Sequence, residues 1–113
     1  MTRDLAKGDI PTLILAILAE GPCHGYSIAR EVERRSQDLL RMREGSLYPA
    51  LRLLEQDGFI EGCWEVQSSG PARRVYTITK AGSAELAKRA IEWKKYMDAI
   101  NSVMGGDAHA RTA

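Results

Sequence analysis

The chain has 113 residues, 44% of them hydrophobic, and a formal net charge of +1. This length is enough for one small domain with a modest core, and it makes a second domain unexpected. The balanced charge neither favours nor excludes nucleic acid as a partner, because a DNA-binding protein can concentrate its basic groups on one surface.

The first predicted element is a helix over residues 10–19, which are apolar on nearly every side. Pro11 is tolerated in the first turn of such a helix. The longest apolar run, LILAIL at residues 13–18, is much shorter than the ~18 residues that a membrane span needs. The N-terminus also lacks the charged region, apolar core and cleavage site of a secretory signal. We therefore expect a cytoplasmic protein without a membrane partner.

A second helix is predicted after the cluster EGPCHG at residues 20–25, where glycine and proline end the first helix. It should end near Ser36. Its apolar side chains fall on one stripe, and charged side chains fill the opposite face. The stripe consists of Ile28, Ala29 and Val32. This pattern is typical of a helix that covers a core on one side and meets water on the other.

The cysteines and histidines do not indicate a metal or cofactor site. Cys23 and Cys63 lie forty positions apart with no other cysteine near them, so their spacing matches neither a redox pair nor a metal-binding motif. We expect both to be reduced, buried thiols. His24 is expected to start the second helix rather than to bind a metal, because the other histidine, His109, lies in the tail.

A third helix is predicted within EGSLYPALRLLEQDG, residues 44–58. Ser46 is expected to cap its N-terminus, and Pro49 to lie in its first turn, where a missing N–H costs no intrahelical bond. Gly58 is expected to end this helix. The core-facing stripe has the spacing i, i+3, i+4 and i+7 and consists of Leu47, Ala50, Leu51 and Leu54. The outward face then carries Tyr48, Pro49, Arg52 and Gln56.

Two half-buried strands are predicted in FIEGCWEVQ, residues 59–67, and RVYTIT, residues 74–79. The side chains expected to share an inner face are Ile60, Trp64 and Val66 in the first run and Tyr76 and Ile78 in the second. Arg73 and Arg74 lie at the tip and shoulder of the hairpin, and residues 67–74 contain no acid. The hairpin loop is therefore predicted to be positively charged.

Residues 80–104 predict a long helix of roughly 37 Å at ~1.5 Å per residue. Apolar residues recur along it at spacings of 4, 3, 4, 3 and 4, which is the seam of a coiled coil. The seam consists of Leu86, Ala90, Trp93, Met97, Ile100 and Met104. A domain of this size is too small to cover the seam with its own side chains. We therefore expect the seam to pair with that of a second copy of the chain. Residues 105–113, GGDAHARTA, are predicted to be a disordered tail.

Three helices followed by a two-stranded hairpin with a basic loop form the element order of a winged helix-turn-helix. The predicted fold class is thus mainly α with a small β-hairpin. Residues 1–79 form the winged helix-turn-helix domain, and residues 80–104 form the dimerisation helix. No enzyme is indicated, because the glycines follow neither a phosphate-loop nor a dinucleotide-binding spacing and there is no nucleophile elbow.

Five segments form a long joint pattern. They are GPCHGYSI at residues 21–28, EGSLYPALRLLEQDGFI at 44–60, Trp64, RRVYTITKAG at 73–82 and Trp93. From about residue 10 to 104 the chain resembles the PadR family of bacterial transcriptional regulators, and its single C-terminal helix resembles the short subfamily. It departs from the family where Val75 stands before Tyr76, since members often carry two tyrosines there, and its wing tip is short and only modestly basic.

The resemblance implies a homodimeric repressor that binds double-stranded DNA at a pseudo-palindromic operator, with one third helix in each half-site. The residues expected to touch DNA are Tyr26, Ser46, Tyr48, Pro49, Arg52, Arg73 and Arg74. Tyr48 is expected to bind phosphate together with the unpaired amides at the start of its helix. Arg52 would contact phosphate or a guanine edge. Tyr26 either supports a backbone contact or packs beneath the second helix, and the sequence does not separate these.

Trp93 is the candidate effector residue. In a dimer formed through the seam, two Trp93 indoles would approach each other and could hold a planar aromatic molecule between them. The resemblance also implies an effector site at the dimer interface, between the last helices and the first helix. Ala90 and Met97, one turn to either side of Trp93, would be its walls, together with Leu86. The alternative is that Trp93 is only the largest side chain packed in the seam.

Two other functional classes stay open on the sequence alone. The chain could be a winged-helix module whose wing binds another protein, or a small-molecule-binding protein that uses the Trp93 site without reading DNA. Salt dependence separates the first from a DNA-binding protein, because neutralising phosphates makes affinity fall steeply as salt rises. A small-molecule carrier would bind aromatic dyes and ignore DNA at low salt.

Overall fold

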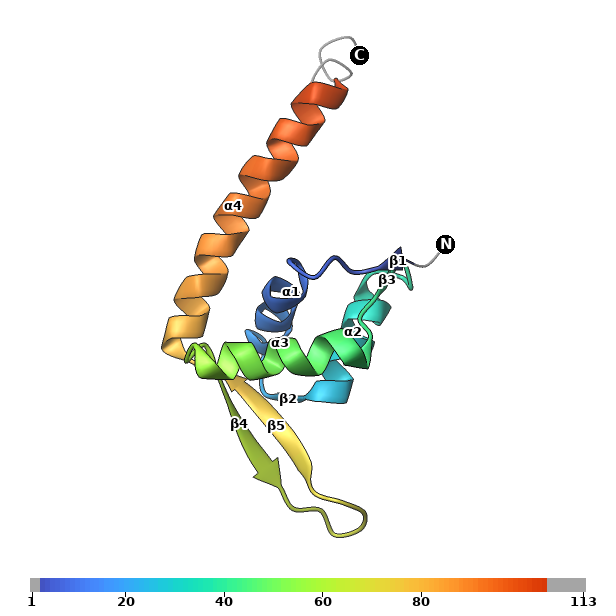
Figure 1. The fold of residues 1–113 in the computed structure, drawn as a ribbon, viewed down its shortest axis with the longest axis vertical. Helices are drawn as coiled ribbons and strands as arrows, with labels where there is room; N and C mark the ends of the chain where they lie inside the picture. The colour runs from blue at the N-terminus through green and yellow to red at the C-terminus, as the bar shows by residue number, and fades with distance from the viewer. Residues whose placement is uncertain (1–2, 106–113) are drawn as a thin grey trace.

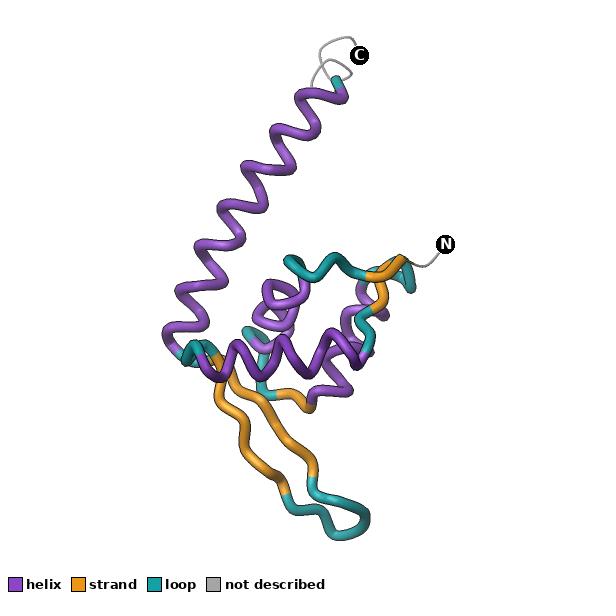
Figure 2. Tube along the Cα trace, viewed as in Figure 1, coloured by secondary structure: helices purple, strands orange, loops and turns teal. Residues whose placement is uncertain are grey.

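The computed structural model describes residues 3–105 and places three packed helices between two projecting arms (Figure 1). One arm is a β-hairpin, and the other is a long C-terminal helix (Figure 2). The molecule measures 60 × 32 × 21 Å along its principal axes. The elements in chain order are β1 (Arg3–Asp4), α1 (Ile10–Leu18), β2 (Cys23–His24), α2 (Gly25–Arg35), β3 (Leu40–Arg41), α3 (Glu44–Gln56), β4 (Ile60–Glu65), β5 (Arg73–Ile78) and α4 (Lys80–Met104).

The core lies between α1, α2 and α3, and it confirms the apolar stripes predicted for the second and third helices. The largest fully buried side chains are Ile14, Leu15, Leu18, Ile28, Leu47, Leu51 and Ile60. Among residues 3–105, no polar or charged residue belongs to this buried set. Met42, in the segment before α3, is also buried, although no periodic pattern marks it in the sequence.

The sheet is larger than the predicted hairpin because a third strand joins it. β4 and β5 pair antiparallel from Ile60 opposite Ile78 to Glu65 opposite Arg73, and β2 pairs with the other edge of β5. A second, parallel pair joins β1 to β3. The strands β1, β2 and β3 have two residues each, too few for an alternating pattern, so the sequence does not reveal them. β2 matters most here, because it fixes the start of α2 against the hairpin.

The β4–β5 hairpin, hereafter the wing, is exposed along its outer half. Ile60 at its base is buried, but Trp64 is 67% exposed and Val66 88% exposed, so the prediction that they are half-buried is wrong. The reason is that the wing projects beyond the helices, so only its base can contact the core (Figure 1). Cys63 is likewise exposed rather than buried. Cys23 is partly covered, and its burial raises the pKa of the thiol.

The start of α3 also differs from the prediction. The helix begins at Glu44, with Arg43 in an extended conformation at the capping position and no side-chain cap. Ser46 is therefore inside the helix, because its N–H already donates to the Arg43 carbonyl oxygen at 3.0 Å. Pro49 lies beyond the first turn, where it removes the N–H that would bond the carbonyl of Gly45. Gly45 is exposed, so water can satisfy that carbonyl.

The long C-terminal helix is confirmed as α4. Its N-terminus is capped by Thr79, whose side chain accepts a hydrogen bond from the Gly82 N–H at 3.0 Å, and it ends at Gly105 in a left-handed conformation. Its first turns touch the body, since Leu86 packs against the core and Arg89 donates to Thr12 Oγ1 at 3.3 Å. Residues 106–113 of the predicted tail lie outside the described residues. Within residues 3–105, no helix combines the length and apolar character of a membrane span.

An ion-pair cluster joins the end of α1 to α2. Arg35 donates to Glu20 Oε1 at 3.0 Å and to Glu31 Oε1 at 2.9 Å, and Arg34 also pairs with Glu31. Hydrogen bonds from Arg34 and Arg35 lower the pKa of Glu31 to about 2, and the hydrogen bond from Arg35 lowers the pKa of Glu20. Glu20 is exposed and Glu31 is only partly covered, so solvent limits what the cluster contributes to stability.

The cluster predicts a pH-dependent stability difference. A lowered carboxyl pKa stabilises the fold above the ordinary value of 4.5, and this stabilisation is lost as pH falls through the folded-state pKa. The melting temperature of the wild type should therefore exceed that of a Glu20→Gln/Glu31→Gln variant at neutral pH, and the two should converge near pH 2. Thermal unfolding followed by circular dichroism measures this. A difference in melting temperature that stayed constant down to pH 2 would contradict the lowered pKa values of Glu20 and Glu31.

Candidate nucleic-acid interface

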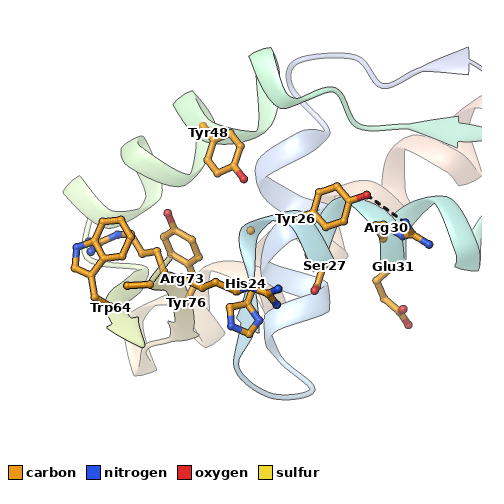
Figure 3. A pocket seen from close by; sticks show the side chains of 12 residues that line it. His24, Tyr26, Ser27, Arg30, Glu31, Tyr48, Trp64, Arg73 and Tyr76 are labelled. Carbon is orange, nitrogen blue, oxygen red and sulfur yellow. Dashed lines mark hydrogen bonds between the residues drawn. The ribbon is translucent and has the colours of Figure 1, made fainter. Parts of the chain in front are cut away.

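An open groove of about 880 Å³ lies between the wing and the start of α2 (Figure 3). Two kinds of side chain dominate its lining. The aromatic ones are Tyr26, Tyr48, Trp64 and Tyr76. The basic ones are Arg30, Arg73 and Arg74. Flat rings beside guanidinium groups suit a ligand that is both planar and anionic.

The groove exists because β2 runs directly into α2. β2 pairs with β5 through Cys23 opposite Tyr76 and His24 opposite Val75, and α2 begins at the next residue, Gly25. The first turn of α2 is therefore held beside the wing. Backbone N–H groups in the first turn of a helix lack intrahelical partners and carry partial positive charge. This end of α2 adds to the anion-binding character of the groove.

Tyr48 lies one turn inside α3, so the prediction that it shares the unpaired amides at the start of its own helix is wrong. Its ring packs over Gly25 instead: a Cβ atom at Gly25 would lie 3.1 Å from Tyr48 Cε1 and 3.5 Å from its hydroxyl oxygen. Only glycine permits this close approach without displacement of the ring. Tyr48 is still 41% exposed, and its hydroxyl points into the groove (Figure 3).

Tyr26 is 56% exposed on the groove, so it does not pack beneath α2. Its hydroxyl accepts a hydrogen bond from Arg30 Nη1 at 3.1 Å, and the Arg30 guanidinium lies 5.6 Å from the ring centroid. Sequence reasoning missed Arg30. The available signal was its position four residues after Tyr26, which places both side chains on one face of a helix.

The two wing arginines differ in their surroundings. Arg73 is exposed, and within residues 3–105 its guanidinium has no hydrogen-bond or ion-pair partner, although its backbone stands opposite Glu65 in the sheet. Arg74 Nη2 donates to Glu55 Oε2 at 2.7 Å, and this carboxylate raises the pKa of the guanidinium. The absence of acids within residues 67–74 therefore does not leave Arg74 unpaired. The acid was missed because Glu55 comes from α3, nineteen positions earlier in the chain.

The remaining predicted DNA contacts lie on α3 outside the groove. Pro49 and Arg52 are exposed, and Ser46 is partly covered. The groove thus brings together Tyr26, Tyr48, Arg73 and Arg74. The groove also contains side chains that were not predicted as site residues, namely His24, Ser27, Arg30, Glu31, Trp64, Ala72 and Tyr76. The roles of all these residues in binding DNA stay predictions.

His24 occupies the capping position of α2 and faces the wing, in agreement with its predicted place at the start of that helix. Its Nε2 atom is buried and lies 3.4 Å from Glu65 Oε1, without a hydrogen bond to any described group. Within residues 3–105, no three His, Cys, Asp or Glu side chains are placed to hold a metal ion together.

The packed helices, the wing and the long final helix define a winged helix-turn-helix protein with an added C-terminal helix. Residues 14–88 match the model of the Transcriptional regulator PadR-like family. The chain belongs to this family and is a transcriptional regulator of the PadR type. The family resemblance of the five sequence segments is thereby confirmed.

Individual relatives agree with this assignment. The chain is 34% identical to Transcriptional regulator Rv3488 of Mycobacterium tuberculosis over 95% of its own length and 94% of that protein's. Among solved structures, smu.1704 from Streptococcus mutans superposes with a TM-score of 0.79 at 27% identity and covers 94% of this chain and 95% of that one. A PadR family transcription regulator from Clostridium difficile gives a TM-score of 0.74 at 35% identity and covers 87% and 100% of the two chains.

Proposed function

We propose that this chain is a homodimeric, sequence-specific DNA-binding repressor with a pseudo-palindromic operator and one α3 in the major groove of each half-site. The observation that carries the proposal is the groove in which Tyr26, Tyr48 and Arg73 converge from α2, α3 and the wing. Helix N-termini, tyrosine hydroxyls and arginines are the groups that bind the phosphate backbone. The proposal assigns the chain no enzymatic activity and no cofactor, and it places the protein in the cytoplasm.

Each DNA-facing element has its own role in this proposal. The exposed face of α3 supplies Arg52 for a phosphate or guanine edge and Pro49 as an apolar surface for a thymine methyl group. Ser46 is a further phosphate donor. Arg73 places a charge at the wing, where it reaches the adjacent backbone.

The exposed stripe of α4 supports the homodimer. Leu86 is partly covered by the body, and Met97 is also partly covered, but Trp93 is 50% exposed, Ile100 36% and Met104 72%. An apolar stripe along a helix that projects from the body is the usual surface of a coiled-coil or bundle partner. A second copy of the chain presents the matching stripe.

The proposal also includes repression of transcription and release of the protein from DNA by an effector. One relative, 29% identical over 65% of this chain, is named Negative transcriptional regulator PadR in Bacillus subtilis, and this chain spans 40% of its length. We assign effector binding to the two Trp93 indoles, with Leu86, Ala90 and Met97 as walls. Tyr96, whose ring lies 5.8 Å from that of Trp93, is a further candidate that the sequence did not single out. A ligand releases DNA only if it binds the DNA-free arrangement more tightly.

A salt titration tests the proposal. The DNA used is a duplex that the protein selects from a random-sequence library, hereafter the selected duplex. If at least six phosphates are neutralised, the affinity of the purified protein for this duplex should fall by about a thousandfold between 50 and 200 mM salt. Affinity that hardly changes with salt would favour a protein-interaction module. Binding of a planar aromatic dye with no DNA binding even at low salt would favour a small-molecule carrier.

The wing predicts a change in this salt slope. Arg73→Gln should reduce the slope by about one phosphate equivalent per subunit and weaken binding to selected and random duplexes alike, because a backbone contact carries no sequence information. Lys88→Gln, an exposed cation on α4, is the matched control and should leave the slope unchanged. Weaker binding to the selected duplex alone, with an unchanged slope, would instead show that Arg73 contacts bases.

A further inference from the structure

We propose that Arg74 is a positioning residue that braces the wing against α3, rather than a phosphate contact. This inference deepens the DNA-binding function proposed above and rests on it. Three contacts hold the guanidinium. It donates to Glu55 Oε2 at 2.7 Å, lies 5.5 Å from the Trp64 ring centroid and lies 5.8 Å from that of Tyr76. The contacted side chains belong to α3, β4 and β5, so one group ties three elements together.

The contacts of Arg74 lie where they can control the angle between the wing and α3. Residues 57–59 join α3 to β4, and β2 holds β5 at Val75 and Tyr76, so Arg74 is the first residue of β5 outside these anchors. Arg74 pairs with Trp64, four residues beyond the base pair of Ile60 and Ile78, or about 13 Å out along the strand at ~3.3 Å per residue. A contact made back to α3 at that distance limits how far the outer part of the wing can bend relative to α3.

Gly62 leaves the space that the guanidinium occupies. A Cβ atom added at Gly62 would lie 2.7 Å from Arg74 Nε and 2.8 Å from Arg74 Cζ. Any side chain there must displace the arginine. The guanidinium must therefore shift to admit a side chain at this position of β4, and Gly62→Ala offers a way to perturb the brace without altering any charge.

The geometry matters for DNA binding because α3 and the wing have to engage the duplex together. A wing that is fixed at the right angle before binding does not lose conformational freedom on binding, whereas a loose wing does. A partly exposed ion pair stabilises a fold only slightly. The brace should therefore affect DNA affinity and wing mobility much more than global stability.

Three substitutions test the brace, and only one of them changes the net charge. Arg74→Lys keeps the positive charge, and Gly62→Ala involves no charged residue. Glu55→Ala removes a negative charge. We expect all three to weaken binding to the selected duplex by about fivefold or more, as for contacts coupled within one network. Glu61→Ala is the matched control, because Glu61 is an exposed acid that points to the other face of the wing. It should bind at least as tightly as the wild type.

Glu55→Ala is the decisive variant. If Arg74 were simply a phosphate contact, removing the competing carboxylate would free it and strengthen binding. Weaker binding supports the brace, and equal or tighter binding overturns it. Hydrogen exchange of the β4 and β5 amides, measured without DNA, is the second readout. It should quicken in all three variants while the melting temperature changes little, and unchanged exchange also overturns the brace.

The exchange measurement separates this inference from the proposed function. If the wild-type protein bound no DNA under any salt condition, the proposed function would fail, whereas faster wing exchange in the variants would still support the mechanical link between Arg74 and α3. If the wild type bound DNA and the Gly62→Ala variant bound equally well, the proposed function would stand and the brace would fail.

Discussion

Replacing Met97 and Ile100 with glutamate is expected to convert the proposed dimer into monomers. Both side chains lie on the α4 stripe, so a dimer would bring four new carboxylates to one interface. Burying unpaired charges costs several kcal/mol per ion even after relaxation, which exceeds what a short helical seam supplies. Light scattering over a concentration series measures the mass directly, and DNA affinity should fall with it because the two half-sites lose their linkage.

The matched control adds the same charges to the opposite side of the helix. Ile91 and Ala99 are exposed and stand more than 90° from the seam at 100° per residue, so Ile91→Glu/Ala99→Glu should stay dimeric. A dimer that persisted in the Met97/Ile100 variant would place the interface on another surface. A control that also dissociated would show that added charge anywhere on α4 disrupts assembly.

The second large effect is a loss of DNA affinity, and it is expected from substitutions on the exposed side of α3. Arg52→Ala should weaken binding to the selected duplex by about 1–3 kcal/mol, because a good arginine contact with a base or phosphate contributes that much. The melting temperature should hardly change, since Arg52 is exposed. Fluorescence anisotropy with the selected duplex measures the affinity.

Tyr48 needs two variants because its ring also packs over Gly25. Tyr48→Phe removes only the hydroxyl that points into the groove, and Tyr48→Ala removes the packing as well. A loss of DNA affinity in Tyr48→Phe identifies a polar contact, whereas a loss only in Tyr48→Ala identifies a structural role. Gln56→Ala, exposed near the end of the same helix, is the control. Unchanged affinity in both the Arg52 and Tyr48 variants would remove α3 as the DNA-reading element.

The helices could be predicted from the sequence because their signals are local. The stripe from Leu47 to Leu54 follows from helical periodicity, and Gly105 ends α4 as a left-handed glycine should. The start of α3 was misplaced by three residues because Ser46 is a good capping residue by type, while the backbone turns at Arg43 without a side-chain cap. Propensity is a weak signal when tertiary contacts fix the preceding segment.

The parts of the site that sequence could not supply depend on distant contacts. The two-residue strand β2 has no pattern of its own, yet it places the start of α2 beside the wing. Glu55 and Arg74 are separated by nineteen positions, and only the fold joins them. Trp64 looked like a half-buried strand residue because alternation shows which side chains share a face, but not whether anything covers that face.

Hydroxyl-radical footprinting of the selected duplex tests the central proposal most directly. A homodimer with one α3 in each half-site should protect two patches related by a twofold axis, with centres one helical turn of about 10 base pairs apart or a multiple of it. The Met97→Glu/Ile100→Glu variant should lose this symmetric pattern. A single asymmetric patch, or even protection along the whole duplex, would contradict sequence-specific binding by a symmetric dimer.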